Sequence, residues 1–247
     1  SVQGVAEMVQ AAEAKAAELN GYLSSLSSMS LDRLEEMHQA SSGAAEFVAT
    51  AQRALTSAQG DGLMLEAKVE FARLQLRLKA VERKAKAVSE AFTNQFERVS
   101  AEATEQLRGA LREGALQADG AYDASALFKK LSASGTDVKL AQVVEYVAKQ
   151  RPELSEEKVM FAFRQLAPHG VGRGGFAGLL AHFVKVVRDI TITDAFEIQS
   201  ARKVRKLEIG ELVEVTSESR VDEGLGLSRA RCRAVRDGAE GWATVRS

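Results

Sequence analysis

Residues 71–92 read FARLQLRLKAVERKAKAVSEAF, and their apolar side chains recur at alternating spacings of three and four residues. This spacing places the side chains on one stripe of a helix and is typical of a coiled-coil seam. The stripe continues to Leu111 with spacings closer to the plain helical period. The stretch therefore predicts a long amphipathic helix around which the rest of the chain is organised.

We place this helix between Leu63 and about Gln117, because proline is absent throughout. Asp61 is its expected N-cap, and Gly109 and Gly114 are expected to fray its far end. At 1.5 Å per residue the helix would be about 80 Å long, which is far longer than the helix of an ordinary globular core.

Residues 1–27 carry a heptad pattern of their own. Its apolar members are Val5, Val9, Ala12, Ala16, Leu19, Leu23 and Leu26. A membrane-surface helix and a coiled-coil strand both fit such a pattern, but the polar face has little basic excess, which favours the coiled coil.

Helical segments are predicted between this segment and the long helix, over Leu31–Ala40 and Ala44–Ala58, with Ser41–Gly43 either as a break between two helices or as a kink within one helix. Phe47, Val48, Ala51 and Leu55 are expected on one face of the second helix. If these pieces return along the long helix, residues 1–118 form an elongated helical hairpin, a coiled coil or an elongated bundle.

Residues 124–194 change to short helices with aromatic anchors. Two helix–loop–helix units follow each other, with Val138 and Val171 as β-like residues in their loops. In hydrophobic spacing this module resembles a paired EF-hand, with its fourth helix reaching about Val187.

The resemblance does not extend to calcium ligands, which must be oxygen atoms at alternating loop positions. A loop centred on Val171 offers Arg164, Leu166, Pro168 and Gly175 at the ligand positions, and Asp137 is the only carboxylate in the loop that ends at Gln142. We therefore expect a vestigial EF-hand-like module that binds no calcium.

Residues 195–247 change to alternating, strand-like patterns. Leu207–Val215 and Leu227–Val235 are two expected strands, and the turn Asp237-Gly238 leads to a third over 240–245. Gly241-Trp242 after this hairpin resembles a bacterial-type SH3-like barrel, with the glycine letting the Trp242 ring lie close over a neighbouring strand. Cys232 alternates with alanines and is expected to be a buried structural thiol.

Taken together, the alanine-rich helices, the degenerate EF-hand-like pair and the barrel resemble large multi-module proteins of dinoflagellate-type algae. The expected fold is mainly α with a small all-β C-terminal domain, divided as 1–118, 124–194 and 195–247. The resemblance implies a fold and carries no known activity.

Composition excludes several classes of function. The 247 residues carry a net charge of −1 with 27% charged residues, which argues against a generic nucleic-acid binder. No apolar run reaches the 18–20 residues of a membrane span, and the single cysteine excludes an internal disulfide. We expect a soluble protein of a reducing compartment or organelle; the first residue is Ser1, which fits a processed or partial chain.

Candidate enzyme and metal sites are weak. His38, His169 and His182 lie far from one another in sequence and from any metal-ligand pattern. The glycine-rich stretch 169–175 lacks the Gly-Lys-Ser/Thr ending and the preceding strand of a phosphate loop. No cofactor is predicted, and Trp242 without neighbouring tyrosines does not indicate a proline-peptide groove.

Two sets of residues are candidate partner-binding surfaces. Phe92, Phe96 and Val99 lie toward the far end of the long helix, where we expect another chain or the EF-hand-like module to cover them. Arg229, Arg231 and Arg233 form a row on one strand, either as a basic patch or as a solvated face paired to Glu211, Glu214 and Glu218.

The leading hypothesis is a non-enzymatic scaffold or linker subunit that bridges components of a larger, organellar or membrane-associated assembly through protein–protein interaction. The alternative is a nucleic-acid- or ribosome-associated accessory subunit that uses the arginine row. A calcium-responsive regulator is disfavoured because the loops lack carboxylates.

Overall fold

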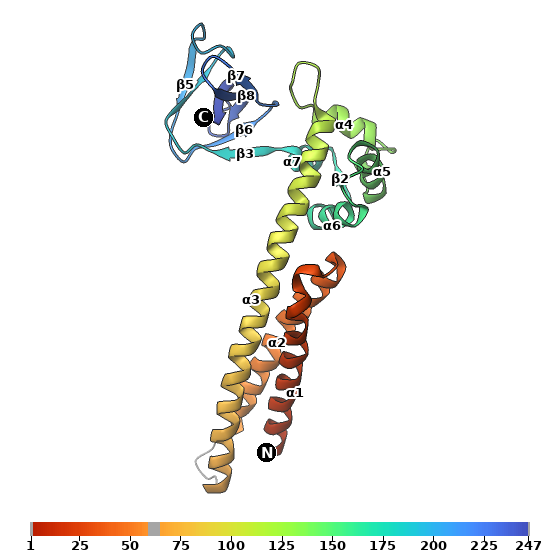
Figure 1. The fold of residues 1–247 in the computed structure, drawn as a ribbon, viewed down its shortest axis with the longest axis vertical. Helices are drawn as coiled ribbons and strands as arrows, with labels where there is room; N and C mark the ends of the chain where they lie inside the picture. Colours follow the sequence, from red (N-terminus) through yellow and green to blue (C-terminus); the bar gives the residue numbers. More distant parts are fainter. Residues whose placement is uncertain (1, 59–64, 247) are drawn as a thin grey trace. The chain divides into compact units, whose positions relative to one another are not determined.

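The structure is a computed structural model and describes residues 2–58 and 65–246. It divides into two compact units, residues 1–102 and residues 103–247. Helices make up the first unit, and the second combines short helices with an antiparallel sheet (Figure 1). The predicted mainly α fold with a small C-terminal β domain is therefore confirmed.

Helix α3 (Leu65–Ala115) is continuous over 51 residues and belongs to both units. Its residues up to 102 lie in the first unit and its last turns lie in the second. The division thus falls within the helix and not at residue 118, where we expected it. The predicted start at Leu63 and the N-cap Asp61 lie outside the described residues.

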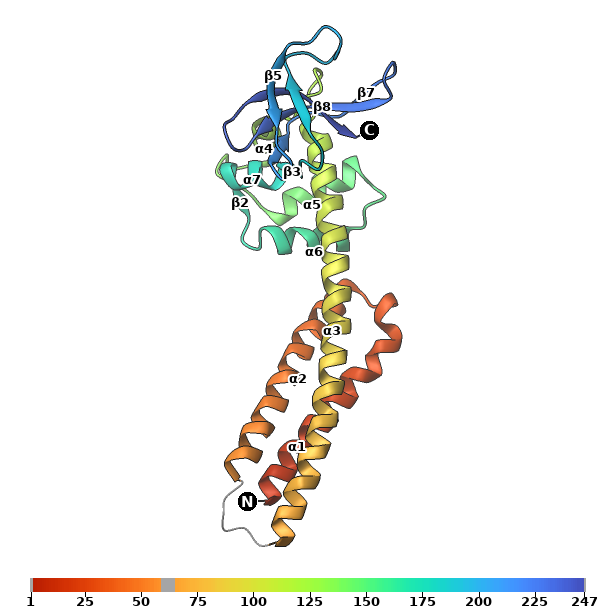
Figure 2. The ribbon, with the colours of Figure 1, turned by 90° about the vertical axis from the view of Figure 1, so that its left-hand side faces the viewer.

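The first unit is a three-helix bundle of α1 (Val2–Gly21), α2 (Leu31–Ala58) and the first part of α3, which lie side by side in Figures 1 and 2. The beginning of α1 packs with the end of α2 and the beginning of α3, so that consecutive helices are antiparallel. The seam of this end consists of Val5, Val9, Ala12, Ala16, Val48, Ala51, Leu55, Phe71, Leu74, Leu78, Val81 and Ala85.

Heptad spacing explains why these helices pair. Buried positions on each helix recur at three and four residues, which keeps one stripe facing the partners along the whole bundle. Alanine occupies many of them and allows the backbones to approach closely, at the cost of less buried area per residue. Arg77 of α3 adds a bidentate ion pair to Glu13 of α1, with N–O distances of 2.9 and 2.7 Å.

Of the two alternatives for Ser41–Gly43, the break is excluded: the segment lies within one continuous helix α2, where Ser41 occupies a core position and its hydroxyl donates to the carbonyl of His38 at 2.8 Å. The expected position of Phe47 on the buried face is wrong. Phe47 lies outside the seam and is 54% exposed. The end of the first predicted helix is a 3-10 helix, η1 (Tyr22–Ser28), whose serine hydroxyls bond carbonyls three residues back.

The last turns of α3 do not fray at the two glycines, because α3 continues to Ala115. Gly114 instead marks a close helix contact, since a Cβ atom there would lie 2.0 Å from the hydroxyl oxygen of Tyr146. Nothing lies within 4 Å of the equivalent position on Gly109. Packing therefore requires Gly114 but not Gly109.

Two helix–strand–helix units follow. α4 (Ala124–Leu131), β1 (Asp137–Val138) and α5 (Leu140–Gln150) form the first, and α6 (Glu156–Leu166), β2 (Val171–Gly172) and α7 (Arg173–Leu180) form the second. Val138 and Val171 pair directly in an antiparallel two-stranded ladder. Both valines were predicted to be β-like, and both lie in strands.

The seven-stranded sheet begins earlier than expected. α7 ends at Leu180, and β3 (His182–Lys185) and β4 (Ile190–Thr193) already belong to the sheet, which therefore begins before residue 195. The fourth helix does not reach Val187, because Phe183 and Val187 are exposed and the intervening backbone pairs with another strand.

The other strands are β5 (Lys203–Leu207), β6 (Leu212–Val215), β7 (Arg220–Asp222), β8 (Leu227–Ala234) and β9 (Glu240–Arg246). Their order in the sheet is β3-β6-β8-β9-β4-β5, with β7 paired to β8, and every pair is antiparallel. The expected strand over 207–215 is two strands separated by a turn at Gly210, whose φ is 92°. The predicted hairpin at Asp237-Gly238 is confirmed, with Gly238 at φ 73°.

The core of the sheet consists of small and branched side chains from five of these strands and from the segment after β3. Its members are Val186, Ile192, Leu207, Val213, Val215, Ala230, Cys232, Ala234 and Ala243. The segment between α3 and α4 contacts the edge of this sheet through the bridge Ala121–Ser217. The peptide nitrogen of Tyr122 also donates to the carbonyl of Thr216 at 3.0 Å.

Replacing each α3 glycine by alanine tests the packing near Tyr146. Gly109→Ala should raise the free energy of unfolding by about 0.5–1 kcal/mol, because alanine loses less backbone entropy in a helix. Gly114→Ala should lower it by about 1–3 kcal/mol, because the Tyr146 ring must move out of a filled site. Urea unfolding of both variants measures this, and equal effects would contradict the assigned contact.

Candidate interaction surfaces

The aromatic residues toward the end of the first unit form an internal core. Phe92 is fully buried in a cluster with Leu19, Leu34, Met37, Ala44 and Val88, and Phe96 and Val99 pack against it. His38 stacks on Phe96 with ring centroids 4.5 Å apart, and its Nδ1 lies 3.5 Å from the hydroxyl of Thr93. The expectation that another chain or the EF-hand-like module covers Phe92 is therefore wrong, because α1, η1 and α2 reach this end of the seam.

A groove remains open on the outside of the first unit, between α2 and α3. It has a volume of about 640 Å³ and an apolar floor that includes Ala45, Val48, Ala49 and Ala85. Its rim carries charges of both signs, namely Arg53, Glu82, Lys86 and Glu90. Ala45 and Ala49 lie one turn apart and are exposed, so that a helix with small apolar side chains fits closely here.

The three arginines of β8 do not form one basic face. Arg229 is 1% exposed, whereas we expected it on the solvated side of the strand. Its guanidinium donates to the hydroxyl of Thr193 at 2.7 Å, to the carbonyl of Trp242 at 3.0 Å, and to the carbonyls of Ala195 and Phe196. The side chain thus ties β8 to β9 and to the segment after β4.

Burial without a carboxylate gives Arg229 an unusual environment. Among the described residues no carboxylate lies within ion-pair distance of its guanidinium, and desolvation lowers the pKa of this group from its ordinary value. Neutral oxygens accept hydrogen bonds from Nη1 and Nη2, whereas the buried Nε has no hydrogen-bond partner among the described residues. Losing the arginine would remove a donor from several of these acceptors.

The other two arginines are paired to carboxylates. Arg231 contacts Asp119 at 3.0 Å, and Arg233 contacts Glu214 of the neighbouring strand at 2.5 Å. Both contacts are partly exposed and contribute little to stability. Pairing of Arg233 to Glu214 follows the expectation of a solvated, charge-paired face, and it leaves no arginine row free for phosphate.

Trp242 is buried, at 8% exposure, but lies outside the core cluster of the sheet. Its ring meets Phe196 edge-on at 5.1 Å, and the guanidinium carbons of Arg220 and Arg231 lie 5.8 and 5.6 Å from its centroid. The segment after β4 thus contacts the ring through Phe196. Trp242 is therefore an anchor for a second, smaller cluster.

Gly241 is needed for the approach of β9 to β4. Its φ is 155°, and an added Cβ atom would lie 2.3 Å from the carbonyl oxygen of Thr193 and 2.6 Å from Cγ2 of Ile192. We expected this glycine to let the Trp242 ring lie close over a neighbouring strand, but the neighbours it accommodates are the β4 backbone and Ile192.

Cys232 is buried at 1% exposure, as expected from its alternation with alanines. Burial raises the pKa of its thiol to about 11, although the backbone N–H of Ala243 acts in the opposite direction. A thiol that stays protonated at neutral pH is a poor nucleophile, so this residue fits a packing role.

The histidines do not converge. His182 lies on β3, not on a helix, and burial together with nearby Arg112 lowers its pKa. In the described parts of the chain, no group of three His, Cys, Asp or Glu side chains is arranged to hold a metal ion. In the first EF-hand-like loop the carboxylate of Asp137 pairs with Lys139 at 2.7 Å, which holds the pKa of Asp137 below its usual range.

None of the helices within residues 2–58 and 65–246 is both long and apolar enough to cross a membrane. Searches against protein-family models, curated protein sequences and solved structures find no match to this chain.

Sequence reasoning missed one buried cation besides Arg229. Arg112, near the end of α3, is 9% exposed; its Nε donates to the carbonyl of Leu180 at 3.0 Å and its Nη1 pairs with Glu105 at 3.0 Å. The hydrogen bond to Leu180 connects the end of α7 to α3. The available signal was its position, because Arg112 directly follows the apolar stripe residue Leu111.

Truncating the arginines of β8 separates a buried role from an exposed one. Arg229→Ala should lower the free energy of unfolding by about 2–5 kcal/mol, because several buried oxygens lose their donor. Arg233→Ala should change it by less than about 1 kcal/mol. Denaturant unfolding measures both, and a similar small loss for the two variants would contradict the buried network.

The raised thiol pKa predicts a pH dependence of stability. Because the unfolded thiol ionises near pH 9 and the folded one near pH 11, the unfolded state loses its proton first as pH rises. Stability is therefore intact below about pH 9 and should fall toward pH 11, by up to about 1.4 kcal/mol per pH unit.

The control for this measurement is Cys232→Ala, which lacks the ionisable group. Urea unfolding of both proteins at pH 7.5, 9 and 10.5 isolates the contribution of the thiol from that of the lysines and tyrosines. Parallel pH profiles for the two proteins would show that the thiol ionises equally well in the folded state.

Proposed function

We propose that this chain is a non-enzymatic scaffold or linker subunit that bridges components of a larger protein assembly. The observation that carries this proposal is the continuity of α3. One uninterrupted helix of 51 residues contributes side chains to the cores of two separate compact units. Neither core by itself requires a helix of this length.

The energetics of α3 support a connecting role. Its stripe residues from Phe71 to Phe92 are buried against α1 and α2, whereas the buried residues between Ala103 and Ala115 lie within the second unit. Each end is therefore stabilised by tertiary packing, which a lone helix in water lacks. Unfolding of α3 would disrupt both cores, so the helix joins the two units as a folded element.

A bridging subunit needs a docking surface, and the groove between α2 and α3 is the best one in the first unit. Its floor is apolar and its exposed alanines leave room for a partner backbone. The rim charges alternate in sign, with Lys86 and Glu90 3.9 Å apart. An amphipathic helix of another subunit, with small residues toward the groove and charges at its edges, has the complementary shape and chemistry.

Charge substitution in the groove tests this function on the full chain. Tagged protein should co-purify from native extract with a reproducible set of subunits. Ala45→Arg together with Ala49→Arg should reduce their recovery by about tenfold or more, since two charges would be buried at the interface. Quantitative mass spectrometry of the purified material measures the recovery.

The matched control is Ala80→Arg with Ala87→Arg. Both alanines are exposed positions of α3 outside the groove, and arginine is a good helix former at all four positions. Circular dichroism and melting should be unchanged in both double variants. The proposal fails if wild-type chain elutes alone at its monomeric size, or if both double variants lose the partners equally.

A further inference from the structure

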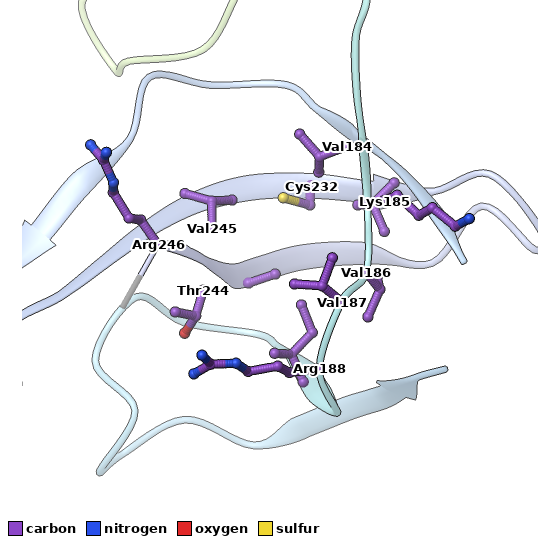
Figure 3. A pocket seen from close by; sticks show the side chains of 12 residues that line it. Val184, Lys185, Val186, Val187, Arg188, Cys232, Thr244, Val245 and Arg246 are labelled. Atoms are coloured by element: carbon purple, nitrogen blue, oxygen red, sulfur yellow. The ribbon is translucent and has the colours of Figure 1, made fainter. Parts of the chain in front are cut away.

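Strands β4 and β9 share a single ladder pair. In the described part of the chain this pair is Thr193 and Trp242. Ladder irregularities occur between Ile192 and Thr193 on β4 and opposite the Ser228–Arg229 step of β8, and such bulges bend strands away from each other. A slot of about 260 Å³ lies where the two strands have separated (Figure 3).

The interior of the slot is apolar. Valine side chains from both sides line it, and Cys232 and Ala243 belong both to its lining and to the core of the sheet. Figure 3 shows Val184, Val186 and Val187 on the segment around β3 and Val245 on β9 gathered around it. Val187 is 78% exposed, so apolar surface remains available to a ligand at this opening.

Three cations surround this apolar interior, namely Lys185, Arg188 and Arg246. All three are exposed, and none makes an ion pair with another described residue. Several other cations of the same sheet are paired: Arg205 with Glu211 and Asp237, Lys206 with Asp189, and Arg236 with Glu208. Three cations without an ion pair thus lie together at the slot and favour an anionic ligand.

The slot also contains a free strand edge. On one side, Ala243–Arg246 pair with β8, but within the described residues no strand pairs with them on the other side. In an antiparallel ladder, alternate residues direct their N–H and C=O groups away from the existing partner. About half of this stretch therefore offers backbone donors and acceptors to an incoming strand.

We propose that the slot binds an extended acidic segment of a partner protein, which adds as a strand to the free edge of β9. Alternate apolar side chains of the segment enter the slot between Val187 and Val245, and its carboxylates face Lys185, Arg188 and Arg246. This inference rests on the proposed function, since it names the chemistry of one partner contact. The backbone edge favours a peptide over a small anion, which would leave the edge unpaired.

Binding of a model peptide to the full chain tests the slot directly. The probe is a blocked heptapeptide that alternates glutamate and valine, and isothermal titration calorimetry measures its Kd. We expect saturable binding that weakens with added salt, because exposed ion pairs are screened. Arg188→Glu with Arg246→Glu should weaken binding by about tenfold or more.

The matched control reverses two cations of the same sheet outside the slot, Lys203→Glu with Arg236→Glu. Both positions are exposed. Each double variant replaces two cations by two glutamates, so the net charge changes equally in the two proteins. The control should bind the peptide within about twofold of wild type, apart from the long-range effect of net charge. Unchanged melting of both double variants shows that the sheet remains folded.

Strand addition is tested with two further peptides, N-methylated at odd or at even positions. One of them should lose binding, because one set of N–H groups faces β9, and the other should keep it. Sodium decanoate and inorganic phosphate are the small-anion controls and should bind more weakly than the peptide.

Four results would overturn the inference: no peptide binding at millimolar concentration, equal losses in the slot and control variants, equal binding of both methylated peptides, or tighter binding of decanoate or phosphate. These outcomes are distinct from failure of the proposed function. The slot variants could bind the peptide as wild type does while the chain still co-purifies with its subunits through the groove. In that case only the slot assignment is wrong.

Discussion

Burial of the apolar seam of α3 is the interaction on which the first unit depends. The seam alternates three- and four-residue steps from Phe71 to Phe92, and α1 and α2 match it with heptads of their own. Because so many of the facing residues are alanine, each layer buries little area, and stability accumulates over many layers. This explains why a chain with few aromatic residues uses long helices: length replaces side-chain size.

The second unit is stabilised by buried cations as well as by buried apolar groups. Arg112 donates a hydrogen bond to the carbonyl of Leu180 at the end of α7. Arg229 donates to oxygens of β4, of the segment after β4 and of β9. A long side chain with several donors can satisfy carbonyls that irregular backbone leaves unpaired. The segment after β4 has no strand partner over 195–201, and Arg229 holds it over Trp242.

The sheet is closed tightly on one side and open on the other. Gly241 allows β9 to approach β4 at Thr193, and beyond that pair the strands separate into the slot. A free edge of this kind invites non-specific pairing unless charges protect it. Lys185, Arg188 and Arg246 repel another basic strand while attracting an acidic one, which couples protection of the edge to selection of a partner.

The sequence by itself determined the elements that have a strong period. Heptads predicted the long helix and its partners, single valines marked the β-like residues of the two loops, and Asp-Gly predicted the β8–β9 hairpin. Periodicity identifies which residues share a face, and it was sufficient for Cys232 and for the inward alanines of β8. Only the tertiary structure decided what covers each face: Phe92 proved internal, Arg229 proved buried, and His182 proved to lie on a strand. The physical reason is that burial of a long or charged side chain depends on segments distant in sequence, here α1 and α2 for Phe92 and residues 193–196 for Arg229.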